Sequence, residues 1–223
     1  MNQIPMSRLR LRFSDTVKGP APAHLLRGAL ASAFPDEPLL HQHTKHGVIY
    51  RYPLVHYRWW NGRGILIGFH EGARLLPQLP LLERQFELGT SPVRIIDIEQ
   101  QFTVEEVKIA DRLLRYRFLT PWLPFDQHNF QKYRAMPQNL RAEERDRIVV
   151  GNLLTTLRGL GIEVPSRLYA TVQVHRAVTC RYKDQRLLGF TGVLLTNIFL
   201  PNDIAVGRAV SHGYGWLKRI CDY

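Results

Sequence analysis

Three histidines and a lysine lie close together in one polar stretch of the chain. His41, His43, Lys45 and His46 are followed directly by Gly47. An imidazole has an unperturbed pKa of about 6.5, so it can take up and return protons at neutral pH. A lysine beside it can stabilise the charge that builds on a phosphate in a transition state. Cleavage of RNA through its own 2′-hydroxyl needs only a base, a cation and an acid, and this cluster could supply all three.

Two other interpretations of the histidine cluster stay open. Imidazole also binds zinc, iron, nickel or copper, and the spacing is similar to the HxHxDH signature of metallo-β-lactamase-like hydrolases. Lys45 stands where that signature has its aspartate, and a fixed cation beside two metal ions has the wrong charge. The third interpretation is a solvated, histidine-rich turn that carries no chemistry.

A second stretch, residues 200–220, combines glycines with basic and aromatic side chains. Glycine tolerates a positive φ and lets a backbone approach a ligand closely, and an aromatic side chain can stack on an unpaired base. The glycine spacing fits neither GxGxxG nor GxxxxGK, so no dinucleotide or nucleoside-triphosphate fingerprint is indicated. The alternative is an ordinary loop between strands. The candidate RNA contacts are Gly207, Arg208, Ser211, His212, Gly213, Tyr214, Gly215 and Lys218.

The overall charge favours a polyanionic partner. The 223 residues include 30 Lys and Arg against 19 Asp and Glu, a net charge of +11. These cations are scattered along the chain, which indicates a folded basic surface rather than a basic tail. Two cysteines, Cys180 and Cys221, stand in no metal-binding spacing. The N-terminus has no apolar signal core, and the longest apolar run, residues 191–201, is too short for a membrane helix. We expect a soluble, cytoplasmic protein with no membrane partner.

The elements that must position these residues follow a recognisable order in the first half of the chain. The hydrophobic pattern predicts strand, helix, strand, strand, helix, strand, which is the order of a ferredoxin-like domain. An Asn-Gly pair predicts the turn of the hairpin. The basic face of the first strand, RLRLRF, is expected to be a solvated face. The predicted elements are strand 8–13, helix 23–34, strand 49–60, strand 64–69, a weak helix 71–82 and strand 93–102.

The second half begins the same pattern again. We predict a strand over 108–119, a polar-aromatic connector over 127–133, a helix over 141–160, strands over 168–182 and 187–199, and a closing strand over 216–220. No clear second helix is predicted here. The fold class is therefore α+β, with two tandem ferredoxin-like (RRM-like) domains at 1–103 and 104–223, the second less regular.

Taken together, these segments resemble the Cas-six family, the CRISPR-associated endoribonucleases that cut repeat RNA. The resemblance lies in five segments in the same order: 39–58, 116–133, 149–161, 187–201 and the glycine-rich 200–215. It implies a tandem ferredoxin-like fold and metal-independent cleavage of CRISPR repeat RNA to guide RNA. Attack by the 2′-hydroxyl would leave a 2′,3′-cyclic phosphate and a 5′-hydroxyl.

The resemblance also implies roles for the histidine cluster. A general-base histidine just after the first helix falls on His41 or His43, Lys45 takes the lysine role, and neither a metal nor another cofactor is expected. The candidate partners are CRISPR repeat RNA, an RNA-guided effector complex and a second copy of the chain. This sequence departs from the family in lacking a tyrosine in 23–34 and in having His212 where arginine is common. Some members only bind RNA, so a non-catalytic RNA-binding subunit is the second hypothesis and a His-cluster metallohydrolase the third.

Overall fold

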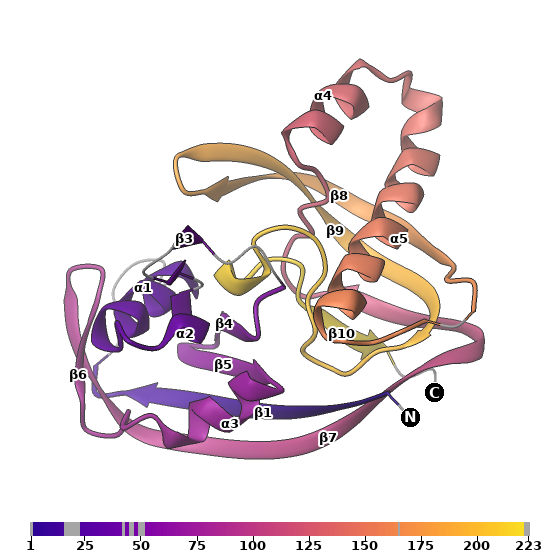
Figure 1. Cartoon of the computed structure of the whole chain (residues 1–223). Coiled ribbons are helices and arrows are strands. Elements are labelled where there is room, and N and C mark those ends of the chain that lie inside the picture. Colours follow the sequence, from indigo (N-terminus) through magenta and orange to yellow (C-terminus); the bar gives the residue numbers. More distant parts are fainter. Residues whose placement is uncertain are drawn as a thin grey trace. The chain divides into compact units, whose positions relative to one another are not determined.

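The computed structural model describes residues 2–15, 23–41, 43–44, 47–48, 52–164 and 166–220, with the backbone alone at 43–44 and 47–48 (Figure 1). The chain divides into two compact units. We call Ile4–Glu105 with Ser211–Gly213 the N-terminal unit, and Met1–Gln3, Glu106–Val210 and Tyr214–Tyr223 the C-terminal unit. No helix in the described part is long and apolar enough to cross a membrane.

The N-terminal unit is built on an antiparallel sheet. Its strands are β1 (Asn2–Phe13), β4 (Val55–Trp60), β5 (Arg63–Phe69) and β7 (Ser91–Phe118), in the order β4-β5-β1-β7, and β6 (Gln85–Leu88) pairs with β7. Because side chains alternate along a strand, Leu9 and Leu11 enter the core while Arg10 between them is exposed. That core also holds Leu26 and Leu30 of helix α1 (Ala23–Ala33). The short helix α3 (Glu71–Leu75) and the 3₁₀ turn Leu76–Gln78 follow β5.

Most predicted elements of this half are confirmed. The strand over 8–13 and the helix over 23–34 are present, and the Asn61-Gly62 turn joins β4 to β5 with positive φ at both residues. The strand predicted over 49–60 begins only at Val55; residues 52–54 are not extended into it, and 49–51 lie outside the described residues. The helix predicted over 71–82 is shorter, because Pro77 lies in the next turn and cannot donate a backbone N–H.

The C-terminal unit pairs the second half of β7 with a long hairpin. β7 pairs with β9 (Gln185–Phe199), β9 pairs with β8 (Ala170–Tyr182), and β10 (Leu217–Ile220) also pairs with β7. Helix α5 (Arg141–Gly159) buries Ile148, Val149, Leu153 and Leu157, whereas Leu154, the fifth residue of the apolar stripe that predicted it, is exposed. Figure 1 shows α4 (Gln127–Ala135) and α5 joined by a short connection beside the β8–β9 hairpin.

Two predictions in this half are wrong. The polar-aromatic connector over 127–133 is helix α4, whose first turn is capped by the Asp126 carboxylate accepting from the backbone N–H of Asn129 at 2.7 Å. Its apolar side chains, Phe130, Tyr133 and Ala135, are too few to form a stripe like that of α5. The strands predicted over 93–102 and 108–119 are one 28-residue strand, β7. Residues 103–107 contain neither Gly nor Pro, and the pairing of β7 with β9 shifts its register between Ile109 and Leu114.

Candidate functional site

The histidine cluster begins at the end of a short helix that side chains hold in place. Helix α2 (Pro38–His41) ends at His41, and the last carbonyls of a helix have no partner within it. Here Nη2 of Arg27, on α1, donates to the His41 carbonyl at 2.6 Å. The hydroxyl of Tyr57, on β4, donates to the Leu40 carbonyl at 2.9 Å. These two hydrogen bonds therefore fix the backbone at the end of α2.

Tyr57 serves this arrangement as a neutral donor. Its side chain is fully buried, and burial raises its pKa well above the ordinary value of 10, against a smaller opposing effect of the Arg27 charge. A phenol with a raised pKa keeps its proton at all physiological pH values. Tyr57 therefore supports α2 and is not itself an acid–base group at neutral pH.

The His41 ring makes one hydrogen bond that favours one tautomer. Its Nε2 lies 3.1 Å from the Pro35 carbonyl oxygen. A carbonyl only accepts, so Nε2 carries the proton, and in the neutral ring Nδ1 is then the basic nitrogen. A histidine whose one nitrogen donates to a carbonyl is a common arrangement for a base at the other nitrogen.

The structure describes the other members of the histidine cluster only in part. His43 lies in the two-residue strand β2 (His43–Thr44), which pairs with β3 (Gly47–Val48), His43 opposite Val48. The His43 side chain, Lys45 and His46 lie outside the described residues. Among the residues that are described, no three His, Cys, Asp or Glu side chains gather as a metal site.

The glycine-rich segment is a narrow loop folded onto its own backbone. The N–H of Val206 donates to the Gly215 carbonyl at 3.0 Å, and the N–H of Leu217 donates to the Ile204 carbonyl at 2.9 Å. Gly215 has a φ of +68°, and a Cβ there would lie 2.0 Å from the Val206 oxygen. Gly207, at φ +100°, would bring a Cβ to 2.7 Å from the Leu123 oxygen. The close approaches that these two glycines allow are approaches to the protein's own chain.

The side chains of this segment make contacts inside the C-terminal unit. Nη1 of Arg208 donates to the Phe125 carbonyl at 2.9 Å. The Tyr214 hydroxyl donates to the Arg181 carbonyl on β8 at 2.6 Å, and burial raises the Tyr214 pKa. Lys218 is exposed on β10, directly opposite Arg117 on β7. Like charges directly opposite each other are unfavourable, so this pair favours an anion nearby.

The tip of the glycine-rich segment belongs to the N-terminal unit. Gly213 packs so closely against the first residue of α1 that a Cβ there would lie 2.7 Å from the Cβ of Ala23. Ser211 is buried, with its hydroxyl oxygen 3.2 Å from Nδ1 of His212. The structure thus assigns Ser211, His212 and Gly213 to the N-terminal unit, and Gly207, Arg208, Tyr214, Gly215 and Lys218 to the C-terminal unit.

A family model described as the Cas6b N-terminal domain matches residues 2–106, and one described as the Cas6b C-terminal domain matches residues 108–220. The chain belongs to the Cas6b family. The resemblance seen in the sequence to the Cas-six family is confirmed.

Solved structures of Cas6b share the fold. One described as Cas6b has a TM-score of 0.87 at 22% sequence identity and covers 98% of this chain and 100% of that chain. Another, described as the CRISPR RNA processing endoribonuclease Cas6b, has a TM-score of 0.75 at 22% identity and covers 97% and 100%. The predicted α+β fold with two tandem ferredoxin-like domains is confirmed. An uncharacterised protein of Methanocaldococcus jannaschii is 28% identical over 137 residues, which is 61% of this chain and 93% of its own length.

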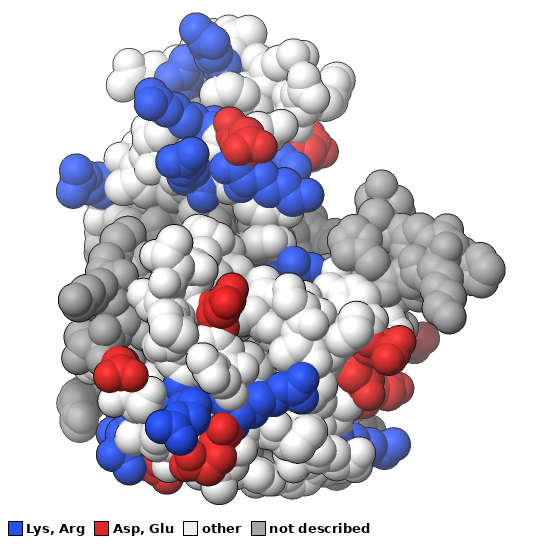
Figure 2. Space-filling view, turned by 90° about the vertical axis from the view of Figure 1, so that its left-hand side faces the viewer, with Lys and Arg blue, Asp and Glu red and all other residues white. Residues whose placement is uncertain are grey.

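Sequence reasoning missed the basic residues that this Cas6b chain displays on the β8–β9 hairpin. Arg176, Arg181, Lys183 and Arg186 are exposed, and none forms an ion pair within the part of the chain that the structure describes. In Figure 2, basic side chains gather over the upper part of the face, at the height of α4 and the hairpin in Figure 1. The sequence signal for this surface was the spacing of Arg and Lys along two predicted strands. The net charge alone does not show where the cations lie.

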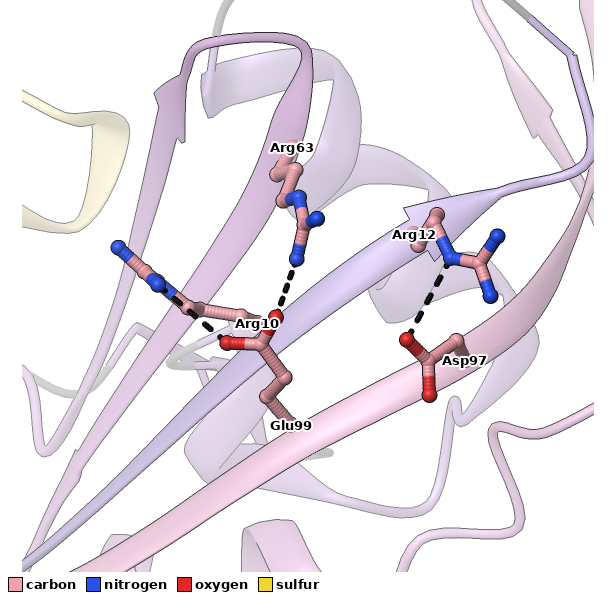
Figure 3. Close-up of polar contacts among 5 residues, drawn as sticks. All are labelled: Arg10, Arg12, Arg63, Asp97 and Glu99. Atoms are coloured by element: carbon pink, nitrogen blue, oxygen red, sulfur yellow. Dashed lines mark hydrogen bonds and ion pairs between the residues drawn. The ribbon is translucent and has the colours of Figure 1, made fainter.

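The arginines of β1 have a different environment. Nη1 of Arg10 lies 3.3 Å from a Glu99 carboxylate oxygen, and Arg63 bonds the other oxygen of the same group (Figure 3). Nε of Arg12 lies 3.4 Å from the Asp97 carboxylate. The acids stand on β7 and the arginines on β1 and β5, so the pairing of strands brings the charges together.

Proposed function

We propose that this protein is an endoribonuclease that cuts CRISPR repeat RNA into guide RNA. Membership of the Cas6b family carries the proposal, because both halves of the chain match its domains. One structure with the same fold is described as a CRISPR RNA processing endoribonuclease. The net charge of +11 suits a polyanionic substrate.

The chemistry that we propose uses side chains only. His41 or His43 takes the proton of the 2′-hydroxyl, and O2′ forms a bond to the adjacent phosphorus. Lys45 stabilises the charge on the phosphate oxygens. The bond from phosphorus to O5′ then breaks, and an acid, the second histidine, returns a proton to O5′. The products are a 2′,3′-cyclic phosphate and a 5′-hydroxyl. The basic Nδ1 of His41 supports the proposal, as does the fixed end of α2 from which the cluster starts.

RNA binding is proposed for the glycine-rich segment and the surfaces beside it. We keep Gly207, Arg208, Ser211, His212, Gly213, Tyr214, Gly215 and Lys218 as candidate contacts. We propose that residues 1–103 and 104–223 are the two ferredoxin-like domains, a division supported by family-model matches that change over between residues 106 and 108. An effector complex and a homodimer stay predictions.

Histidine substitution tests the mechanism. We expect His43→Ala or His41→Ala to leave the protein folded and RNA-bound, while at least one of them lowers the single-turnover cleavage rate about 10²- to 10⁴-fold, the usual effect of a positioned acid or base. Lys45→Ala should slow cleavage less, because proton transfer remains. His175→Ala is the matched control, an exposed histidine on β8, and should cleave at the wild-type rate. The measurement is product formation from labelled repeat RNA with protein in excess.

Two changes of condition separate the alternative functions. A substrate with 2′-deoxyribose at the cut site should bind and not be cut, and cleavage of that substrate at the normal rate would identify water as the attacking group. Addition of EDTA should leave the rate unchanged, and a loss of cleavage would favour the metallohydrolase. A wild-type protein that binds repeat RNA and never cuts it would be a non-catalytic RNA-binding subunit. If both histidine variants cleave at the wild-type rate, neither histidine is the base, and His212 is the next candidate.

A further inference from the structure

The C-terminal unit contains a pocket that the proposed chemistry does not use. Its volume is about 460 Å³, within the range of small-ligand sites. It lies where three segments meet: the start of α4, the start of β9 and the glycine-rich segment. The residues that decide its chemistry are Phe125, Asp126, Phe130, Gln185, Arg186 and Arg208.

Two aromatic rings form the apolar part of the pocket. The ring centroids of Phe125 and Phe130 lie 6.1 Å apart, at an interplanar angle of 47°. Phe125 is buried and fixed from behind by Tyr133, whose ring centroid is 4.5 Å away. Phe130 is 36% exposed, although a phenyl ring gains nothing from solvent. The pocket therefore offers a rigid ring and a second, accessible ring on which a flat ligand could stack.

Two arginines give the same pocket a positive edge. Arg208 is held in position twice, by its Nη1 bond to the Phe125 carbonyl and by its backbone N–H, which donates to the Leu123 carbonyl at 2.9 Å. Arg186 is exposed and forms no ion pair with any described residue. Asp126 also lines the pocket, but its two oxygens already accept from the backbone N–H and the side-chain amide of Asn129. Two cationic groups thus line the pocket with one acid, and neither arginine forms an ion pair with Asp126.

A ligand that matches this pocket has a flat ring, an anionic group and hydrogen-bonding edges. We propose that the pocket binds one unpaired nucleotide of the RNA strand. The base stacks on Phe130 above Phe125, and a phosphate of the strand lies against Arg186 and Arg208. The Gln185 amide, also in the lining, can both donate to and accept from the edge of the base. This subsite would make one position of the substrate more important for affinity than its neighbours. The proposal rests on the proposed function, because it needs a protein that binds repeat RNA.

Coupling between one side chain and one base is the test. Repeat RNA with 2′-deoxyribose at the cut site is made with each nucleotide in turn replaced by an abasic one, and the Kd of each is measured with the full chain. Stacking of a base on an aromatic ring is worth about 5- to 100-fold in Kd. We expect one abasic position to cost that much with the wild-type protein, and less than about 2-fold with Phe130→Ala. Phe102→Ala is the matched control, because Phe102 is a 54% exposed phenylalanine outside the pocket; it should keep the full penalty.

A charge variant gives an independent readout. Arg186→Ala should reduce the slope of log K against log salt by about 0.7, the contribution of one phosphate on a single strand. Arg158→Ala is its control, an exposed arginine in the last turn of α5, and should leave the slope unchanged. If Phe130→Ala is unstable, Phe130→Leu keeps the apolar volume and removes the π face, and the same loss of coupling is expected.

The outcomes separate this proposal from the one on which it rests. If repeat RNA binds, and every abasic position costs the same with wild type and Phe130→Ala, the pocket does not hold a base and only this inference is overturned. If the wild-type protein does not bind repeat RNA at all, the proposed function itself is wrong. If a free mononucleotide binds to wild type but not to Phe130→Ala, and RNA affinity shows no such coupling, the pocket is a small-molecule site and the inference is also overturned.

Discussion

The first strand and the β8–β9 hairpin carry similar numbers of arginines, yet they present different surfaces. Arg10 and Arg12 on β1 face Glu99 and Asp97 on the neighbouring strand β7. The hairpin cations from Arg176 to Arg186 have no such acid among the described residues, and Asp184 at the turn forms no ion pair with them. Exposed ion pairs contribute little to stability, but they do cancel the local field.

This difference decides where the net charge of +11 can act on a partner. A cation with an acid on the next strand contributes little to the potential felt by RNA, whereas unpaired cations on one hairpin add up. The strand register decides between the two cases, and the register is a property of the fold. The hairpin is also tied to the glycine-rich segment, because the Tyr214 hydroxyl donates to the Arg181 carbonyl. The open basic surface therefore depends on a buried loop.

The largest effect should come from breaking that loop. Gly215→Ala places a Cβ 2.0 Å from the Val206 oxygen, at a φ of +68° that other residues adopt with strain. We expect the free energy of unfolding to fall by about 3 kcal/mol or more, from backbone strain and overpacking together. Urea unfolding followed by fluorescence measures the loss, and RNA affinity should fall with the folded fraction.

Gly151→Ala is the matched control for this substitution. Gly151 lies in α5, and nothing is within 4 Å of a Cβ added there. Alanine is the better helix former by about 1 kcal/mol, so this variant should be slightly more stable than wild type. A Gly215→Ala protein as stable as wild type that loses RNA binding would show that the glycine faces RNA and that the segment is itself an open surface.

Much of the fold could be predicted because its signals are local. The apolar stripe of α5, the Asn61-Gly62 turn and the alternation in β1 each reflect a few neighbouring residues. Helix α4 was not predicted because it has only two aromatic side chains and one alanine among nine residues, and its support comes from the Asp126 cap and from Tyr133 packing against Phe125. The continuity of β7 was not predicted because the expected order of two ferredoxin-like domains placed a boundary near residue 103, although residues 103–107 contain neither glycine nor proline.

The contacts of the candidate site were harder to predict because they join residues that lie far apart in the sequence. The glycines were singled out correctly as positions of unusual backbone, and Gly207, Gly213 and Gly215 all have positive φ. The sequence did not show that Gly215 approaches the carbonyl of Val206, nine residues earlier. Arg27 and Tyr57 hold the end of α2 from α1 and β4, and no local pattern marks them for this role.

A second test compares the two basic surfaces directly. We expect the double variant Arg176→Ala and Arg181→Ala to lower the slope of log K against log salt for repeat RNA by about 1.4, two phosphates at about 0.7 each. The double variant Arg10→Ala and Arg12→Ala removes the same charge from ion-paired positions, and its slope should change by less than half as much. Fluorescence anisotropy over a salt series gives both slopes. Equal changes would mean that pairing with acids does not decide which cations RNA meets.

The smallest effect concerns Glu99, the acid that two arginines share. Hydrogen bonds from Arg10, and then from Arg63, hold the Glu99 pKa below its ordinary value of 4.5. A carboxylate with a lowered pKa in the folded state contributes stability above its ordinary pKa, and that contribution is lost as the pH falls through the folded pKa. We expect Glu99→Gln to be slightly less stable than wild type at pH 7, and the difference to shrink as the pH falls below 4.5.

The control for this last comparison is an acid on the same strand. Glu105 lies on β7 and forms no ion pair within the described chain, so Glu105→Gln should show no such pH-dependent gap. Urea unfolding at a series of pH values between 7 and 3 compares the three proteins. A gap between wild type and Glu99→Gln that stays constant over this range would mean that the arginines do not hold the ionised carboxylate. Glu99 pairs with two of the three arginines drawn in Figure 3, Arg10 and Arg63. The difference in charge between strand β1 and the β8–β9 hairpin would then need another cause.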